Sequence, residues 1–241
     1  HLAPFIPIPG KDNGFDIEGL AVAGDRLYVG LRGPVLRGWA IILSLDVKVS
    51  KRDEGRLKLA RREVARSAKG KPVLRCYAKH FIHLDGMGIR ELRAVGKDLL
   101  ILAGPTMDLD GTIAVFRWKG GAMADRDCMV AEQAVERLFD VPHGTGKDAG
   151  KDKAEGMTLW PSTRDGKAKE LLVLYDSPSA RRCRGDHGVV SDLFPVGDAV
   201  QRESRRAHPR SRKKEKTALP TSEDDQPGDS LIGRLTSALG I

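Results

Sequence analysis

The sequence predicts an all-β protein built from repeated units, and three observations carry this prediction. Glycine and proline are abundant, with 27 and 13 copies in 241 residues, whereas aromatic residues make up only 5%. This composition is typical of short elements joined by many turns. Three similar segments recur about 68 residues apart. Within each segment, runs rich in Val, Ile, Leu and Tyr are bounded by Gly, Pro or Asp, which indicates β-strands.

The three segments begin near residues 15, 84 and 153 and follow one order. Each has an apolar run that opens on a glycine, a polar turn, a second apolar run and a closing proline. The segments are FDIEGLAVAGDRLYVGLRGP, LDGMGIRELRAVGKDLLILAGP and KAEGMTLWPSTRDGKAKELLVLYDSP. Aligning their opening glycines, Gly19, Gly88 and Gly156, gives a nearly even period, and such a period indicates repeated structural units.

The apolar runs predict four antiparallel strands per unit. Strands are expected over 17–22, 26–31 and 39–47 in the first unit and over 89–94, 99–103 and 112–118 in the second. A fourth strand is expected around 80–84, 136–141 and 189–196 in the three units. Four-stranded antiparallel units at a fixed period are typical of β-propeller blades. We therefore expect the C-terminal portion of a β-propeller with about three blades, with its upstream blades preceding His1.

The chain divides into a partial β-propeller over 1–198 and a charged C-terminal tail over 199–241. The tail carries a basic run from Arg205 to Lys216 and an acidic run from Ser222 to Asp229, and paired blocks of opposite charge predict disorder. A second charged stretch, over 48–72, interrupts the first unit and is expected at the surface, either as a helix or as an extension of the strands. No run approaches the roughly 20 apolar residues that cross a bilayer, which predicts a soluble protein.

The formal net charge of +8 raises nucleic acid as a partner. The basic run of the tail has no aromatic residue on which a base could stack, so the sequence disfavours nucleic acid. Three widely spaced cysteines, Cys76, Cys128 and Cys183, predict free thiols rather than a disulfide framework or a metal clamp.

A propeller brings the first strand of each blade to a central channel, whose mouth is a common ligand site. The residue before the opening glycine is Glu18 in the first unit and Glu155 in the third, but Met87 in the second, and Asp16 shares a strand face with Glu18. Convergent carboxylates suit a hard cation such as Ca²⁺ or a basic group of a substrate. The alternative is structural, with the carboxylates capping backbone amides or pairing with Arg32.

Two further sets of residues are candidate ligand sites. Arg32 and Arg37 lie among glycines in GLRGPVLRGWA, a pattern suited to binding phosphate or carboxylate unless the arginines are solvated or paired. Asp108 and Asp110 precede Gly111 in TMDLDG and are similar to the start of a calcium loop. The later ligands of such a loop are absent, and a simple turn is the alternative reading of this stretch.

No catalytic residue is assigned from the sequence. The glycine-rich stretch that starts at His143 lacks the Gly-x4-Gly-Lys spacing of a phosphate-binding loop. His80 and His83 lie three apart in a predicted strand, hence on opposite faces, where they cannot easily chelate one metal. No serine lies in a Gly-x-Ser-x-Gly elbow, so covalent hydrolysis has no candidate nucleophile.

The phrases FDIEGLA, GLRGP and LAGPTMDLDG, with EGM and LLVLYDSP in the third unit, resemble a bacterial family of domains of unknown function over residues 13–196. That family is similar in turn to the esterase-like phytase propellers, which share a Glu-Gly opening in their blades. The resemblance implies a bacterial β-propeller and transfers no catalytic residue to this chain.

These observations predict a propeller that binds a small molecule or a protein partner at the mouth of its channel. One alternative is a calcium-assisted hydrolase of phosphoesters or carboxylic esters, for which the three carboxylates and the phytase-like resemblance are the motives. A second alternative is nucleic-acid association through the basic tail.

Overall fold

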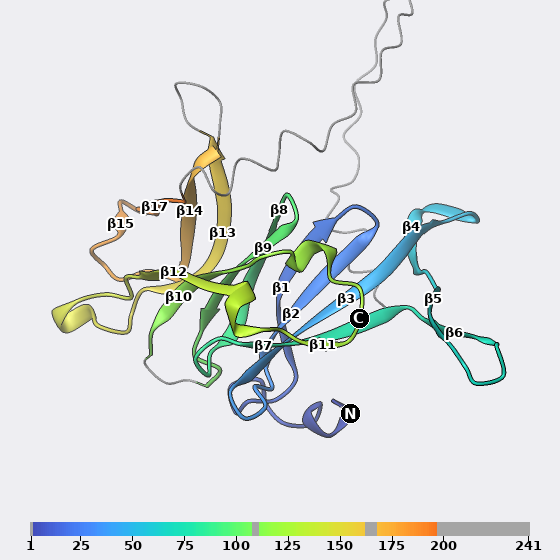
Figure 1. The fold of residues 1–241 in the computed structure, drawn as a ribbon. Helices are drawn as coiled ribbons and strands as arrows, with labels where there is room; N and C mark the ends of the chain where they lie inside the picture. Colours follow the sequence, from blue (N-terminus) through green and yellow to red (C-terminus); the bar gives the residue numbers. More distant parts are fainter. Residues whose placement is uncertain (1, 108–110, 162–167, 197–241) are drawn as a thin grey trace, which may run out of the picture.

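The computed structural model describes residues 2–107, 111–161 and 168–196, and every statement about the fold concerns these residues. Their regular structure consists of β-strands and short 3-10 helices, so the predicted all-β class is confirmed. Figure 1 shows three sheets side by side in chain order, from the sheet of β1 to the sheet of β13. No helix in the described part of the chain is long and apolar enough to cross a membrane. The 3-10 helices are η1 (Ala3–Phe5), η2 (Gly121–Met123), η3 (Glu132–Ala134) and η4 (Gly146–Asp148).

The first sheet is formed by antiparallel neighbours in the order β1, β2, β3, β7, and the short strand β11 adds to β7 in parallel. A two-residue turn joins β1 to β2, and its first residue, Gly24, has a φ of 59°, a conformation that glycine adopts without steric cost. The strands are β1 (Asp16–Ala23), β2 (Arg26–Gly33), β3 (Trp39–Ser50), β7 (Tyr77–His83) and β11 (Cys128–Met129).

The second sheet has four antiparallel strands in sequential order, β8 (Gly88–Val95), β9 (Asp98–Gly104), β10 (Ile113–Trp118) and β12 (Val135–Val141). The third sheet consists, in the described part of the chain, of β13 (Lys153–Pro161), β14 (Ala168–Ser177) and β17 (Asp192–Pro195). The strand expected around 189–196 is therefore the third strand of its sheet rather than the fourth. A separate small hairpin pairs β15 (Cys183–Arg184) with β16 (Gly188–Val189).

The core lies in two layers, one on each face of the second sheet. Side chains alternate along β9 because successive residues of a strand point to opposite faces. Leu99, Ile101 and Ala103 pack into the cluster shared with the first sheet, whereas Leu100 and Leu102 pack into the cluster shared with the third. Every residue of β9 is buried, so the second sheet is enclosed between its two neighbours.

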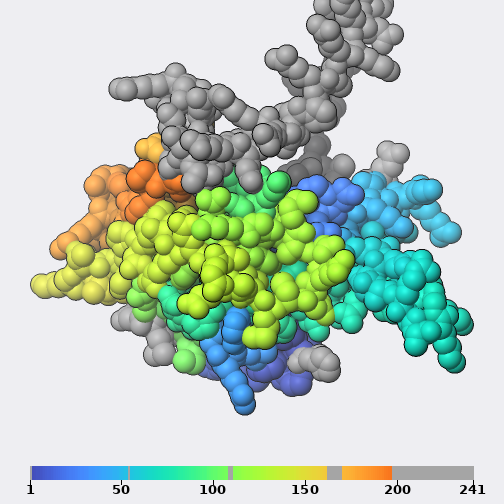
Figure 2. Space-filling view, in the orientation of Figure 1, coloured from blue at the N-terminus to red at the C-terminus, as the bar shows by residue number. Residues whose placement is uncertain are grey.

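Residues 48–75, which we call the arm, form strands, and this decides the choice that the sequence left open between helix and strand. The strand β4 (Asp53–Leu59) pairs with the end of β3, and β5 (Arg62–Arg66) pairs with β6 (Pro72–Arg75) in a second hairpin. Figures 1 and 2 show both hairpins projecting from the first sheet. All three cysteines are free thiols, as predicted.

Candidate functional site

Each of the three sheets begins with a hairpin whose first strand has a β-bulge at a charged residue. In the first hairpin, Ile17 pairs with Leu31 and Gly19 pairs with Gly30, so Glu18 has no partner across the ladder. A bulge inserts one extra residue and turns its side chain away from the regular alternation. The Glu18 side chain is therefore positioned by a break in the strand pairing.

The second and third hairpins have the same irregularity. In the second, Ile89 pairs with Ala103 and Glu91 with Leu102, which leaves Arg90 unpaired. In the third, the residues on either side of Glu155 pair with Tyr175 and Leu174, so Glu155 is the unpaired residue. The pairing register thus makes Glu18, Arg90 and Glu155 equivalent positions of the three sheets.

These three bulge residues line one pocket of about 310 Å³. The pocket forms where β8 packs against both β1 and β13, so it lies between the first strands of the three sheets. Arg32, from the end of β2, is the second arginine in its wall. Further polar side chains of the lining come from loops and strand ends, namely Lys11, His143, Asp152, Lys153, Asp176 and Ser177.

The two arginines of the pocket each pair with carboxylates. Arg32 Nη1 donates to Glu18 Oε1 at 2.7 Å and lies 3.6 Å from Asp16 Oδ2. Arg90 Nη1 donates to Glu155 Oε1 at 2.8 Å, and its Nη2 donates to the Pro105 carbonyl oxygen at 3.2 Å. The Arg90 side chain is only 5% exposed, so the ion pair with Glu155, rather than solvent, stabilises its positive charge.

The pairing leaves polar atoms in the pocket wall unsatisfied. Glu18 Oε2, Arg32 Nε and Arg90 Nε are buried and have no hydrogen-bond partner among the described residues. Burial raises the pKa of Glu18, and the neighbouring charges of Arg32 and Arg90 offset only part of that effect. Buried polar groups in proteins are nearly always satisfied, so three such atoms on residues of one pocket distinguish this cluster of charges from the rest of the described structure.

A glycine makes room for the Arg90 guanidinium. A Cβ atom at Gly104 would lie 2.5 Å from Arg90 Nε, closer than real contacts allow. Gly104 ends β9, directly beside the Pro105 carbonyl that accepts a hydrogen bond from Arg90. Both strands of the second hairpin therefore position the Arg90 side chain: β8 carries it, and the end of β9 leaves space for it.

The structure brings together the three carboxylates predicted for the channel mouth and one of the two arginines predicted to bind an anion. Glu18, Glu155 and Arg32 line the pocket, and Asp16 lies beside Arg32. The structural alternative, in which the carboxylates pair with Arg32, is the arrangement observed for Asp16 and Glu18. Arg37 does not join them. It is exposed in the turn between Leu36 and Trp39, with a φ of 52°, and it is absent from the pocket wall.

Sequence reasoning missed Arg90 because it aligned the opening glycines. That alignment placed Met87 at the position of Glu18, whereas Met87 belongs to the core cluster between the first two sheets. The signal that identifies Arg90 is a charged residue directly after the paired residues Ile17, Ile89 and Ala154. This signal becomes visible only once the strand register is known.

The carboxylates do not assemble into a metal site in the described part of the chain. No group of three or more His, Cys, Asp or Glu side chains is placed there to hold an ion. Glu18 and Glu155 each face an arginine, so the predicted cluster with Asp16 is replaced by two ion pairs. The predicted pair Asp108 and Asp110 lies outside the described residues.

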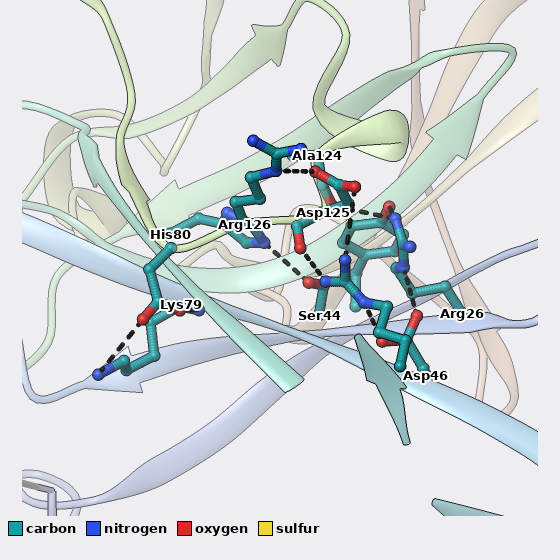
Figure 3. Close-up of polar contacts among 11 residues, drawn as sticks. Arg26, Ser44, Asp46, Lys79, His80, Ala124, Asp125 and Arg126 are labelled. Atoms are coloured by element: carbon teal, nitrogen blue, oxygen red, sulfur yellow. Dashed lines mark hydrogen bonds and ion pairs between the residues drawn. The ribbon is translucent and has the colours of Figure 1, made fainter. Parts of the chain in front are cut away.

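A serine and a histidine meet elsewhere, in the core of the first sheet. His80 Nε2 lies 2.9 Å from Ser44 Oγ, and His80 Nδ1 lies 3.3 Å from Cys128 Sγ, in a polar cluster that Figure 3 shows in part. Burial lowers the pKa of His80 to about 4 and raises the pKa of the Cys128 thiol. Ser44 is 1% exposed, so no substrate can reach its hydroxyl, and the contact is structural.

Comparisons with known proteins identify a family and nothing more specific. No curated protein and no solved structure matches the chain. The model of the family described as "Protein of unknown function (DUF3616)" matches residues 1–192, which include all three first strands and every residue of the pocket wall. The chain belongs to this family of proteins of unknown function, DUF3616.

Proposed function

We propose that the chain is part of a β-propeller and binds a small anionic ligand in the pocket between its first strands. The observation that carries this proposal is the convergence of the three bulge residues, Glu18, Arg90 and Glu155, on one polar pocket. Three hairpins built alike bring one charged side chain each to a shared centre, as blades do around a propeller channel.

The exposed faces of the outer sheets support the propeller. In the first sheet, Leu20 and Val22 point away from the core and are 49% and 61% exposed. In the third sheet, Leu174 of β14 and Leu193 of β17 are likewise exposed. Apolar sheet faces are normally covered, and further blades on both sides of the three sheets would cover them.

The arginines support an anionic ligand. A pocket of about 310 Å³ has the size of a small-molecule site. A guanidinium presents a planar fork of donors that matches a carboxylate or phosphate, and Arg32 and Arg90 both line the pocket. A ligand anion would take the place of the Glu18 or Glu155 carboxylate beside its arginine. Burial raises the pKa of Glu18, and this favours the replacement.

Isothermal titration calorimetry of the full chain with inorganic phosphate and with citrate tests the proposal. We expect binding that Arg90→Gln weakens by about tenfold or more, because a charge-assisted hydrogen bond is worth about 1.5–3 kcal/mol. Arg37→Gln is the matched control, since Arg37 is exposed and outside the pocket wall, and it should leave binding unchanged. Equal affinity in both variants, or no binding of either anion, contradicts the proposal.

The calcium-assisted hydrolase remains the competing prediction, and the same protein tests it. A Ca²⁺ titration that Glu155→Gln abolishes, together with calcium-dependent turnover of a phosphoester, would favour the hydrolase over the anion-binding module. We expect neither, because Glu155 accepts a hydrogen bond from Arg90, whose positive charge opposes a cation at the same carboxylate.

A further inference from the structure

The arm, residues 48–75, differs from the rest of the molecule in charge. It contains eleven lysine and arginine residues and three acidic residues, a surplus of eight that equals the formal net charge of the whole chain, +8. Figures 1 and 2 show its two hairpins standing away from the sheets, so this charge is concentrated on a projecting part of the surface. A basic stripe on one element is the electrostatic footprint of a polyanion site.

Six of these cations make no ion pair with a described residue. Lys48 and Lys58 lie directly opposite each other across the β3–β4 ladder, a like-charge pair that destabilises a hairpin on its own. Both are exposed, and neither makes an ion pair with a described residue. The same holds for four further cations along the arm, Lys51, Arg61, Lys69 and Lys71.

The base of the arm is joined to the first sheet and to the loop at Asp125 by ion pairs. Asp46 accepts hydrogen bonds from Arg26 Nε at 3.1 Å and from Arg62 Nε at 2.5 Å, and Arg62 also contacts Asp125. Figure 3 shows Arg26, Asp46 and Asp125 meeting at this junction. Charge-assisted contacts thus attach the arm to the rest of the molecule.

We propose that the arm binds the phosphate backbone of double-stranded nucleic acid. Phosphates remove the repulsion between Lys48 and Lys58, and release of their counterions drives the association. A two-stranded β-ribbon has the width that the major groove of a duplex admits, with phosphates along both rims. The contacts are to the backbone, so binding is independent of sequence. This surface is distinct from the basic tail and from the pocket.

The position of the apolar side chains favours a duplex over an anionic membrane. Val49 and Leu57 pair midway along the β3–β4 ribbon, and they are exposed on the face away from the lysine pair. Charged residues lie at the tips of both hairpins. The tip of the first carries Lys51 and Arg52, and the tip of the second carries Lys69 and Lys71. A hairpin that inserts into a bilayer needs apolar side chains at its tip, and strongly charged tips oppose insertion.

Fluorescence anisotropy with a labelled duplex of mixed sequence tests this proposal on the full chain. The variant combines Lys48→Gln, Lys58→Gln, Lys69→Gln and Lys71→Gln, whose side chains are exposed and make no ion pair with a described residue, so its circular dichroism should match that of the parent. We expect its affinity to fall by about tenfold or more and the slope of log K against log salt to become shallower by about 3.6, because each of the four phosphate contacts contributes about 0.9.

Two controls separate the arm from other sources of charge. Arg93→Gln, Lys97→Gln and Lys147→Gln together remove exposed cations outside the arm and should leave binding within about twofold. Neutralising Arg212, Lys213, Lys214 and Lys216 tests the tail. Loss of binding with the tail variant but not with the arm variant overturns the proposal. Binding through the arm to phosphatidylserine vesicles, without binding to the duplex, also overturns it. A second variant, Lys69→Gln with Lys71→Gln, gives a smaller loss if the proposal holds.

Discussion

At the scale of single residues, burial decides which ionisable groups are charged. His80 is fully buried between Ser44 and Cys128, and desolvation keeps its imidazole neutral in the folded state. The pKa of Glu18 shifts in the opposite direction. Burial raises the pKa of its carboxyl group and so favours the protonated form, which is again the neutral one. The shift at His80 links protonation to stability at pH values below neutrality.

The buried histidine predicts a pH dependence of folding. Its pKa is lowered from 6.5 to about 4, so between these values the unfolded chain binds a proton that the folded chain excludes. Stability is therefore expected to fall as pH decreases from 6.5 to about 4, by about 3 kcal/mol from this group. Urea unfolding across that range measures the effect. His80→Gln should flatten the dependence, whereas His187→Gln, at an exposed position, should not.

At the scale of elements, glycines next to the bulges allow the sheets to approach. Gly19 and Gly156 both follow a bulge glutamate, but they differ in what surrounds them. A Cβ atom at Gly19 would lie 2.9 Å from Ile89 and 3.0 Å from Leu92, both of β8, whereas at Gly156 the nearest atom is 3.6 Å away. At Gly19 the first and second sheets are therefore closer together than any residue with a side chain would permit.

This difference predicts unequal effects of one substitution at two equivalent positions. Gly19→Ala should lower the free energy of unfolding by about 1–3 kcal/mol, because the added methyl group pushes β1 away from β8. Gly156→Ala adds the same group without a close contact and should change stability by less than about 0.5 kcal/mol. Thermal and urea unfolding of the two variants provide the comparison. Equal losses would show that the tight packing against β8 is not the cause.

At the scale of the whole molecule, the two outer sheets leave apolar faces open in the described part of the chain. Sheets that expose apolar side chains associate with a second surface, because burial of that area is favourable. Leu20 and Val22 form the more exposed of these faces, on the strand that also carries Glu18. The polar pocket and the apolar face thus lie on one hairpin.

We predict that the 241-residue chain self-associates through this face, and sedimentation velocity over a range of concentrations measures it. Leu20→Thr with Val22→Thr should weaken the association by about thirtyfold, because each substitution removes on the order of 1 kcal/mol of burial. Met123→Thr, at an exposed position on η2, is the control and should have no effect. A chain that stays monomeric at all concentrations would contradict this prediction.

The sequence by itself determined the all-β class and most strands of the first two sheets, because alternation, turn glycines and apolar runs are local properties of the chain. It left the strands of the arm undecided. It also indicated Glu18, Glu155 and Arg32, whose residue types and positions at the hairpins are visible without a structure. Only the tertiary structure decided that Arg90 completes the pocket and that Arg37 does not. The physical reason is register, since one extra residue in a bulge turns a side chain to another face, and the local sequence around Met87 and Arg90 does not specify which residue is the extra one.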